Sequence, residues 1–265
     1  MSGPDPTDIF THTGDPAWLL NHGLFVAEGR HVTRRLLATP RFETVALLLT
    51  PTAEAALGDV LGSALEAGVT VDVRSQAELD ALTGFRLHQG CVAFARRRPL
   101  PVCEPASWGA GLSVLLERVR DPDNVGSIMR SASGMGVQRV IIGPECADPF
   151  YRKAIRTSMG AVLTLDVCEA RPWPDVLDAC REAGQTLVAT TPDPRAPLLD
   201  EVAAHLHGGV ILLVGSEGEG LTAQARAAAQ LEARIPMVGA VDSLNVAVAT
   251  AVAVYAVTRG RGHDK

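Results

Sequence analysis

The sequence lacks the patterns by which metal centres and disulfide frameworks are usually recognised. It holds five cysteines in 265 residues, and no two of them form a Cys-x-x-Cys pair. These are Cys91, Cys103, Cys146, Cys168 and Cys180. The seven histidines contain no His-Glu-x-x-His motif, and we expect His205 and His207 on the surface. We therefore predict no metal site, no disulfide framework, and a cytoplasmic protein with reduced thiols.

The sequence also lacks a segment that could cross a membrane. Its apolar run from Val246 to Val257 is broken only by Thr250, but it is shorter than the ~20 apolar residues that a bilayer requires. The start of the chain has no charged region followed by an apolar one, so we expect no signal peptide.

Lysine is nearly absent, because Lys153 and Lys265 are the only lysines among 24 basic residues. The net charge of −6 argues weakly against a nucleic-acid partner, since phosphate contacts require cations. Net charge says little about local patches, however, and arginine suits bidentate phosphate contacts. The base composition of the genome is a simpler explanation of the arginine content.

The length and the pattern of elements predict two α/β domains. We expect residues 1–20, rich in Pro, Asp, Thr and Gly, to form a flexible N-terminal arm. Residues 21–98 alternate between strands and helices and predict a small α/β unit. The run Arg96-Arg97-Arg98 with the following prolines predicts a linker at 99–111, although such a run would also suit a phosphate contact. Residues 112–265 predict a mostly parallel sheet with helices on both faces.

The expected elements follow from hydrophobic periodicity and from turn residues. In the first domain, we expect strands at 25–29, 44–50, 69–73 and 91–95, and helices at 30–38, 52–67 and 75–82. In the second domain, we expect strands at 113–118, 139–142, 161–168, 186–191, 210–215 and 233–237. We expect its helices at 125–134, 149–159, 173–183, 221–231 and 246–257. Ser75 and Glu78 predict a capping box at the third helix.

The first motif that could carry chemistry is DPDNVGSIMR at residues 121–130. A turn leads into a helix at Asn124, whose amide is available for recognition. The apolar residues of this helix face the core, so Arg130 is expected to point toward solvent or a partner. The ordinary interpretation is an N-cap asparagine and a surface arginine.

The second motif is the glycine-rich loop GSEGEG at residues 215–220, directly after an apolar strand. Such a loop between a strand and a helix commonly binds a ligand. It matches neither Gly-x-Gly-x-x-Gly nor the phosphate-binding Gly-Lys-Ser/Thr pattern, and its two glutamates would repel pyrophosphate. The loop therefore argues against NAD and ATP and favours a ligand with little negative charge. A plain glycine-rich turn is the alternative.

The third motif joins Ile235-Pro236-Met237 to Ser243-Leu244-Asn245 at the start of the last helix. Proline marks a strand exit, where backbone groups can pair with a flat ring such as adenine. Ser243 is the expected N-cap, and a helix that is apolar all round is expected to be buried. The alternative is an ordinary strand, turn and capped helix.

The three motifs together, in this order, resemble those of the SpoU (TrmH-like) branch of the SPOUT superfamily of RNA ribose 2′-O-methyltransferases. They read DPDNVGSIMRSA, LLVGSEGEGLT and IPMVGAVDSLNVAVAT, and the resemblance covers about residues 112 to 260. The first unit is similar to the small substrate-binding domain that many of these enzymes carry, through FVAEGRHVTRRLL and HQGCVAFA.

The resemblance implies an α/β fold whose C-terminal segment is threaded into a deep trefoil knot that binds S-adenosylmethionine. It also implies a homodimer with the active site at its interface, and no metal. The residues that it places at the cofactor are Gly215, Ile235, Leu244, Met237, Thr190 and Gly220.

The resemblance also assigns catalytic roles. Arg130 is the implied catalytic arginine, often proposed as a general base toward the ribose 2′-hydroxyl. Because an arginine with a pKa above ~12 is a poor base, orientation of the phosphate and hydroxyl is the alternative role. The positions that would place the ribose, the arginine and the loop are Asn124, Glu217, Ser243 and Asn245.

The resemblance favours large-subunit ribosomal RNA as the substrate, because the extra N-terminal domain is typical of enzymes that act on it. Transfer RNA is the runner-up. Candidate RNA contacts are Arg30, Arg34, Arg35, Arg152 and Arg156. A non-catalytic RNA-binding relative is opposed by the intact polar motif positions, and a nucleotide-binding oxidoreductase is opposed by the two loop glutamates.

Overall fold

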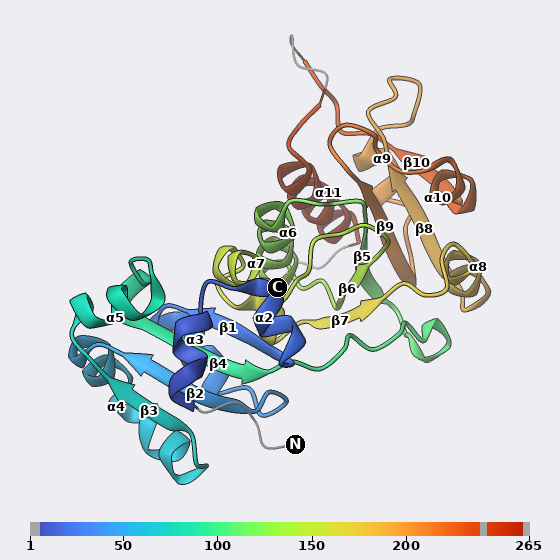
Figure 1. Cartoon of the computed structure of the whole chain (residues 1–265). Coiled ribbons are helices and arrows are strands. Elements are labelled where there is room, and N and C mark those ends of the chain that lie inside the picture. The colour runs from blue at the N-terminus through green and yellow to red at the C-terminus, as the bar shows by residue number, and fades with distance from the viewer. Residues whose placement is uncertain (1–5, 239–242, 262–265) are drawn as a thin grey trace. The chain divides into compact units, whose positions relative to one another are not determined.

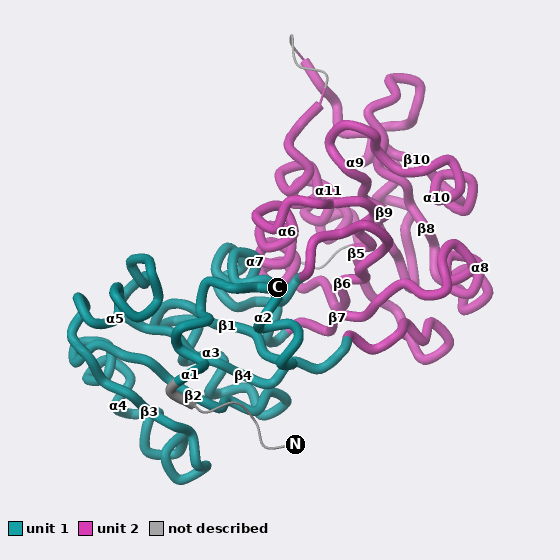
Figure 2. The backbone as a smooth tube through the Cα atoms, in the orientation of Figure 1, with its two compact units in different colours: residues 1–99, 149–164 teal, residues 100–148, 165–265 magenta. Residues whose placement is uncertain are grey.

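The structure is a computed structural model that describes residues 6–238 and 243–261 (Figure 1). The chain forms two compact units, shown in Figure 2. Unit 1 comprises Met1–Pro99 and Pro149–Thr164, and unit 2 comprises Leu100–Asp148 and Leu165–Lys265. The segment 149–164 therefore belongs to unit 1 by its contacts, although it lies inside the second expected domain. Its Phe150 ring packs 5.4 Å from the Phe25 ring of unit 1.

Unit 1 contains a four-stranded sheet in the order β1-β4-β2-β3. Only the β2–β3 pair is parallel, and β4 runs antiparallel to both of its neighbours. The strands are β1 (Leu24–Glu28), β2 (Thr44–Leu49), β3 (Thr70–Val73) and β4 (Cys91–Arg96). The helices are α3 (Arg30–Leu37), α4 (Pro51–Glu66), α5 (Gln76–Thr83) and α7 (Arg152–Thr157). The Ser75–Glu78 capping box is confirmed.

The start of the described chain is folded, so the flexible arm predicted for residues 1–20 is wrong from residue 6 onward. This N-terminal segment forms α1 (Pro6–Ile9), a 3-10 turn η1 (Phe10–His12) and α2 (Pro16–Asn21). Phe10 is fully buried, and its ring lies 5.6 Å from that of Phe94. Composition misled the prediction because a few apolar anchors, here with Ile9 and Leu19, fix an otherwise polar segment. The part of the prediction that concerns residues 1–5 lies outside the described residues.

Unit 2 contains a six-stranded sheet in the order β10-β8-β9-β5-β6-β7. Every adjacent pair is parallel, which confirms the predicted parallel α/β sheet. Its strands are β5 (Gly111–Glu117), β6 (Arg139–Ile142), β7 (Asp166–Glu169), β8 (Gln185–Thr190), β9 (Gly209–Gly215) and β10 (Leu231–Ala233). The helices are α6 (Pro122–Gly134), α8 (Asp175–Glu182), α9 (Leu199–Ala203), α10 (Ala223–Ala228) and α11 (Val246–Gly260).

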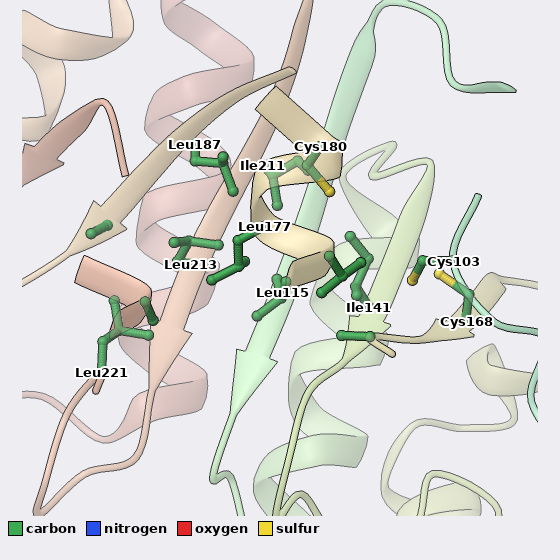
Figure 3. Close-up of a cluster of buried hydrophobic side chains, with 14 residues drawn as sticks. Cys103, Leu115, Ile141, Cys168, Leu177, Cys180, Leu187, Ile211, Leu213 and Leu221 are labelled. Carbon is green, nitrogen blue, oxygen red and sulfur yellow. The ribbon is translucent and has the colours of Figure 1, made fainter. Parts of the chain in front are cut away.

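Both faces of this sheet are buried, as expected for parallel strands covered by helices. On one face, Leu115 and Ile211 point toward Leu177 and Cys180 of α8, as Figure 3 shows. On β5 the alternate residue, Val114, is also fully buried. The continuous apolar runs of the strands follow from this double burial.

Three expected elements in the C-terminal half differ from the structure. The strand predicted at 161–168 is a 3-10 turn, η4 (Ala161–Leu163), followed by β7, because Gly160 adopts a left-handed conformation. The helix predicted at 221–231 is limited to α10, and Leu231 already belongs to β10. The strand predicted at 233–237 ends at Ala233.

The last helix, α11, is not buried all round as its composition predicted. Val248, Val252 and Tyr255 are 50%, 40% and 60% exposed and lie along one stripe at helical spacing. The opposite side, with Val254 and Val257, is fully buried. Periodicity cannot separate these two faces because both are apolar.

The described residues contain no helix with the length and hydropathy needed to cross a membrane. They also contain no group of three His, Cys, Asp or Glu side chains able to hold a metal ion. All five cysteines are free. Burial raises the pKa of the Cys91 and Cys146 thiols to about 11, so both are protonated near neutral pH.

We expect Phe10→Ala to lower the free energy of unfolding of unit 1 by about 3–5 kcal/mol, because it leaves a cavity beside Phe94. Leu20→Ala, which shortens an exposed side chain of α2, should alter the free energy of unfolding by less than about 0.5 kcal/mol. Urea unfolding of both variants measures the difference. Equal stabilities would contradict the anchoring role of Phe10.

Candidate active site

The candidate site lies at the carboxyl ends of neighbouring parallel strands in unit 2. β5 and β9 are paired in register as far as Glu117 and Gly215, so the loops that follow them emerge side by side. The chain continues from β5 to β6 on one side, while β9 lies on the other side. Such a reversal of strand order is where open α/β sheets bind ligands. The first and second motifs therefore meet at this edge.

The carboxylate of Glu217 joins the three motifs. Its Oε1 atom accepts hydrogen bonds from Asn124 Nδ2 at 3.3 Å and from Asn245 Nδ2 at 2.5 Å. It also accepts one from the backbone N–H of Val246 at 3.2 Å. Val246 is the first residue of α11, where the helix dipole favours a negative charge.

The two asparagines are also bonded to each other, because Asn245 Nδ2 donates to Asn124 Oδ1 at 2.9 Å. Asn245 Oδ1 caps α11 by accepting from the N–H groups of Ala247 and Val248, at 3.0 and 3.3 Å. The predicted N-cap, Ser243, is therefore wrong. The Oδ1 atom of Asn245 thus caps the helix, while its Nδ2 atom bonds Asn124 and Glu217 of the other two motifs.

The alternative interpretation of Asn124, as an ordinary N-cap, is wrong. α6 begins at Pro122, and Asp121 is its cap, accepting from the N–H of Asp123 at 3.0 Å. Asn124 lies in the first turn instead. Its side chain is consequently available to bond Glu217 and Asn245.

A cavity of about 630 Å³ opens beside this network. Its size falls in the range of about 300–1,000 Å³ that is usual for small-molecule sites. All six residues that the resemblance placed at the cofactor line it: Thr190, Gly215, Gly220, Ile235, Met237 and Leu244. Glu217 and Ser243 line it as well. The structure thus brings together residues from four separate segments of the chain.

Three predicted catalytic residues, Asn124, Arg130 and Asn245, lie outside this lining. Asn245 is bonded to the lining residue Glu217. Asn124 reaches it only through Glu217. Arg130 is exposed on α6, which packs against α11. No hydrogen bond or ion pair holds the Arg130 side chain within the described part of the chain.

The glycines of the second motif are required by its backbone geometry. A Cβ atom on Gly215 would lie 2.2 Å from the carbonyl carbon of Gly220 and 2.3 Å from the nitrogen of Leu221. The loop folds back here, and the N–H of Gly220 donates to the carbonyl of Ser216 at 3.0 Å. Gly220 has a φ of 66°, which favours glycine. A side chain at residue 215 would therefore displace the cavity wall.

Glu117 is a functional candidate that the sequence interpretation missed. It is fully buried at the end of β5. Its two carboxylate oxygens accept from the N–H and hydroxyl of Thr222, at 2.8 and 2.7 Å. Thr222 also caps α10 through a hydrogen bond from Ala225 N. The available signal was an acidic residue that closes the apolar strand SVLLE.

The second loop glutamate is also held by the chain itself. Glu219 lies 3.1 Å from Arg118 and 3.7 Å from Arg120, measured between charged atoms. Both loop glutamates line the cavity. Glu219 is paired with the two arginines, whereas Glu217 is bonded to the other motifs.

The charged residues at the cavity leave it unsuited to phosphate. Arg226 lines it, but the guanidinium is paired with Glu232 through two hydrogen bonds of 2.9 and 3.0 Å. Asp193 also lines it, and hydrogen bonds from Arg195 lower the pKa of that carboxyl. The cavity therefore presents carboxylates, and the positive charge of Arg226 is neutralised by Glu232.

The arginines predicted to bind RNA lie in unit 1, where several have partners. Arg34 pairs with Asp59 and with the carbonyl of Ala56. Arg152 and Arg156 lie 3.6 and 3.7 Å from the buried carboxylate of Glu28. Arg30 and Arg35 are half-buried on α3. Their contacts with RNA stay predictions.

Two family models match the chain in the order of its two expected domains. The model of the SpoU rRNA methylase family matches residues 111–255, more than half of the chain. The model described as RNA 2′-O ribose methyltransferase substrate binding matches residues 26–101.

Individual relatives agree with these matches. An uncharacterized tRNA/rRNA methyltransferase of Mycobacterium tuberculosis is 43% identical over 91% of this chain and 82% of its own length. A 23S rRNA (guanosine-2′-O-)-methyltransferase of Burkholderia is 30% identical over 87% of this chain and 94% of its own. An AdoMet-bound rRNA methyltransferase from Sinorhizobium meliloti superposes with a TM-score of 0.81 at 26% identity, covering 98% and 96% of the two chains. The chain belongs to the SpoU rRNA methylase family.

Proposed function

We propose that the protein is an S-adenosylmethionine-dependent methyltransferase that methylates a ribose 2′-hydroxyl in large-subunit ribosomal RNA. The observation that carries this proposal is the convergence of three motifs on Glu217, beside a cavity lined by all six expected cofactor residues. The names of relatives that cover nearly the whole chain support the same reaction.

The residues of the cavity fit this cofactor. S-adenosylmethionine, when bound, supplies an electrophilic methyl group on a positively charged sulfur, and it carries no phosphate. The apolar side chains of Leu199, Val214 and Leu244 suit its adenine ring, and the nearby carboxylate of Glu217 suits its charge. Arg226 is already paired with Glu232, so it offers no free positive charge to a pyrophosphate. These features disfavour NAD and ATP.

Arg130 acts on the RNA rather than on the cofactor. Arginine is in general a poor base for the 2′-hydroxyl proton. It can instead hold a phosphate in two parallel hydrogen bonds and place the neighbouring hydroxyl in line with the methyl group. Such positioning supplies much of the rate of a displacement reaction.

Asn124, Glu217, Ser243 and Asn245 complete the site. The bonded trio of Asn124, Glu217 and Asn245 fixes the glycine-rich loop against the start of α11. Ser243, exposed at the cavity, is placed to contact the ribose or the cofactor. The candidate RNA-binding arginines of unit 1 hold the rest of the substrate.

Transfer of labelled methyl groups from S-adenosylmethionine to separate pools of large-subunit ribosomal RNA and transfer RNA tests the function. We expect label as 2′-O-methylnucleoside in the ribosomal pool. Label only in transfer RNA would replace the proposed substrate with the runner-up. Binding of S-adenosylmethionine without transfer to either pool would favour a non-catalytic relative, and failure to bind it would contradict the proposal.

Arg130→Ala should reduce methyl transfer at least 100-fold, an order of magnitude typical for loss of a positioning contact. The dissociation constant of S-adenosylmethionine should change less than about twofold, because Arg130 lies outside the cavity. Arg181→Ala, on the exposed side of α8, is the matched control and should retain transfer. Turnover of Arg130→Ala at the wild-type rate would remove this residue from the catalytic set.

Glu117 positions the second motif and is not itself catalytic. Glu117→Ala leaves the part-buried N–H and hydroxyl donors of Thr222 without their acceptor and releases one end of the loop. We expect S-adenosylmethionine to bind about tenfold more weakly in calorimetry, with partial recovery in Glu117→Gln. The exposed Glu182→Ala is the control. Wild-type affinity in Glu117→Ala would contradict the positioning role.

The protein forms a homodimer through α11, and the apolar stripe of Val248, Val252 and Tyr255 supports this part of the proposal. We expect a mass in solution near twice 27.9 kDa. Tyr255→Glu should shift the protein toward the monomer and reduce methyl transfer with it. Leu65→Glu, on exposed α4, should leave the dimer intact. A monomeric wild-type protein at assay concentration would contradict the dimer.

The trefoil knot and the cytoplasmic location complete the proposal. The knot is implied by family membership. A cytoplasmic location accords with five free thiols and with ribosomal RNA as the substrate.

A further inference from the structure

Three aromatic rings form a continuous stack on the surface of unit 1. The imidazole of His12 lies 4.1 Å from the indole of Trp18, with an interplanar angle of 3°. The imidazole of His22 covers the other face of the indole at 3.9 Å and 20°. The three nearly parallel rings thus have the spacing of stacked nucleobases.

The core of unit 1 holds the stack in place. Trp18 packs against the core cluster that contains Phe10 and Leu19. The backbone N–H of Trp18 donates to the capping carboxylate of Asp15 at 2.9 Å. The backbone carbonyl of Trp18 is hydrogen-bonded to the Nδ1 atom of His22 at 2.8 Å. The outer ring, His22, is exposed. The core therefore fixes the indole, while the outer face of the His22 ring is directed away from it.

An arginine run lies beside the stack. In the antiparallel pair of β1 and β4, Leu24 is opposite Arg96, and the N–H of Arg97 donates to the carbonyl of Gly23 at 2.7 Å. The run therefore begins next to the residues that follow His22. Its last member, Arg98, is exposed.

Arg96 lies on the face of the sheet against which the stack packs. Directly opposite residues of an antiparallel pair point to the same face, and Leu24 belongs to the core cluster. The Arg96 side chain is 41% exposed, and its ion pair with Glu43 is long, at 3.9 Å. Such an exposed pair contributes little and can exchange for a phosphate.

An exposed ring at the end of a stack, with cations nearby, suits an unpaired nucleotide. Bases stack on aromatic side chains with little regard to sequence, while arginines contact the phosphates. We propose that His12, Trp18 and His22 form a stacking platform for an unpaired base of the RNA, with Arg96 and Arg98 on its backbone. The inference rests on the proposed function for the nature of the ligand. The platform's three rings lie before residue 26, where the match to the substrate-binding family begins.

Binding of a fluorescein-labelled single-stranded oligoadenylate, followed by anisotropy without cofactor, tests the platform. His22→Ala should weaken binding about five- to tenfold, in line with the loss of one stacking contact. His22→Phe keeps a flat ring and should bind within about twofold of wild type. His205→Ala removes an exposed histidine of unit 2 and is the matched control. Circular dichroism melting verifies that the variants remain folded.

Two further measurements separate stacking from simple charge. An oligomer of abasic ribose phosphates should bind wild type and His22→Ala equally, because it has no base to stack. Arg98→Ala should reduce the slope of log affinity against log salt by about 0.7, the value for one phosphate contact on a single strand.

Equal affinity of His22→Ala and His205→Ala for the oligoadenylate would overturn the inference, as would a loss that His22→Phe fails to restore. This assay involves no methyl transfer. A wild-type protein that methylates no RNA would therefore refute the proposed function and leave the binding result intact. Normal methylation with unchanged oligoadenylate binding by His22→Ala would refute the platform alone.

Discussion

A single carboxylate oxygen, Oε1 of Glu217, is the point on which the site depends. It accepts from the side chains of Asn124 and Asn245 and from the first N–H of α11. Asn124 lies 93 residues before Glu217 and Asn245 lies 28 residues after it, so no local structure brings these donors together. The parallel pairing of β5 and β9 brings the first two motifs together by ending both strands at one edge, and α11 supplies the third.

The side-chain contacts around Glu217 are exposed, so water weakens each of them. Further contacts behind them add to the rigidity. Glu117 holds Thr222 at the far end of the loop, and Arg118 holds Glu219 in its middle. The glycine-rich loop is thus tied at three places, which leaves its backbone fixed along the cavity. A loop fixed in advance binds its ligand without the entropic cost of ordering it.

Sequence patterns predicted β5, β6, β8 and β9 of unit 2 well, because parallel strands buried on both faces are continuous apolar runs. The motifs were also recognisable, since they combine glycines and polar residues at strand ends. The helix caps were harder. Pro122 at the first helical position already indicated Asp121 as the cap of α6, but Asn124 is an equally good cap by residue type. The choice between Ser243 and Asn245 depends on Glu217, a residue distant in sequence.

Other features could not be predicted because they depend on tertiary contacts. The folding of the N-terminal segment depends on Phe10 meeting Phe94 across the sequence. The assignment of residues 149–164 to unit 1 depends on Phe150 meeting Phe25 and Phe42. The exposed stripe of α11 is apolar like its buried side, so composition conceals it. In each case the local sequence is compatible with two outcomes, and packing decides between them.

A double-mutant cycle on Glu217→Ala and Asn245→Ala, read out by calorimetry of S-adenosylmethionine binding, tests the central claim most directly. If the Glu217 carboxylate couples the second and third motifs, the two losses will be non-additive by about 0.5–3 kcal/mol, as for contacting residues. Losses that add to within about 0.3–0.5 kcal/mol would show that the two residues act independently. That result would contradict the account of a site assembled on one carboxylate.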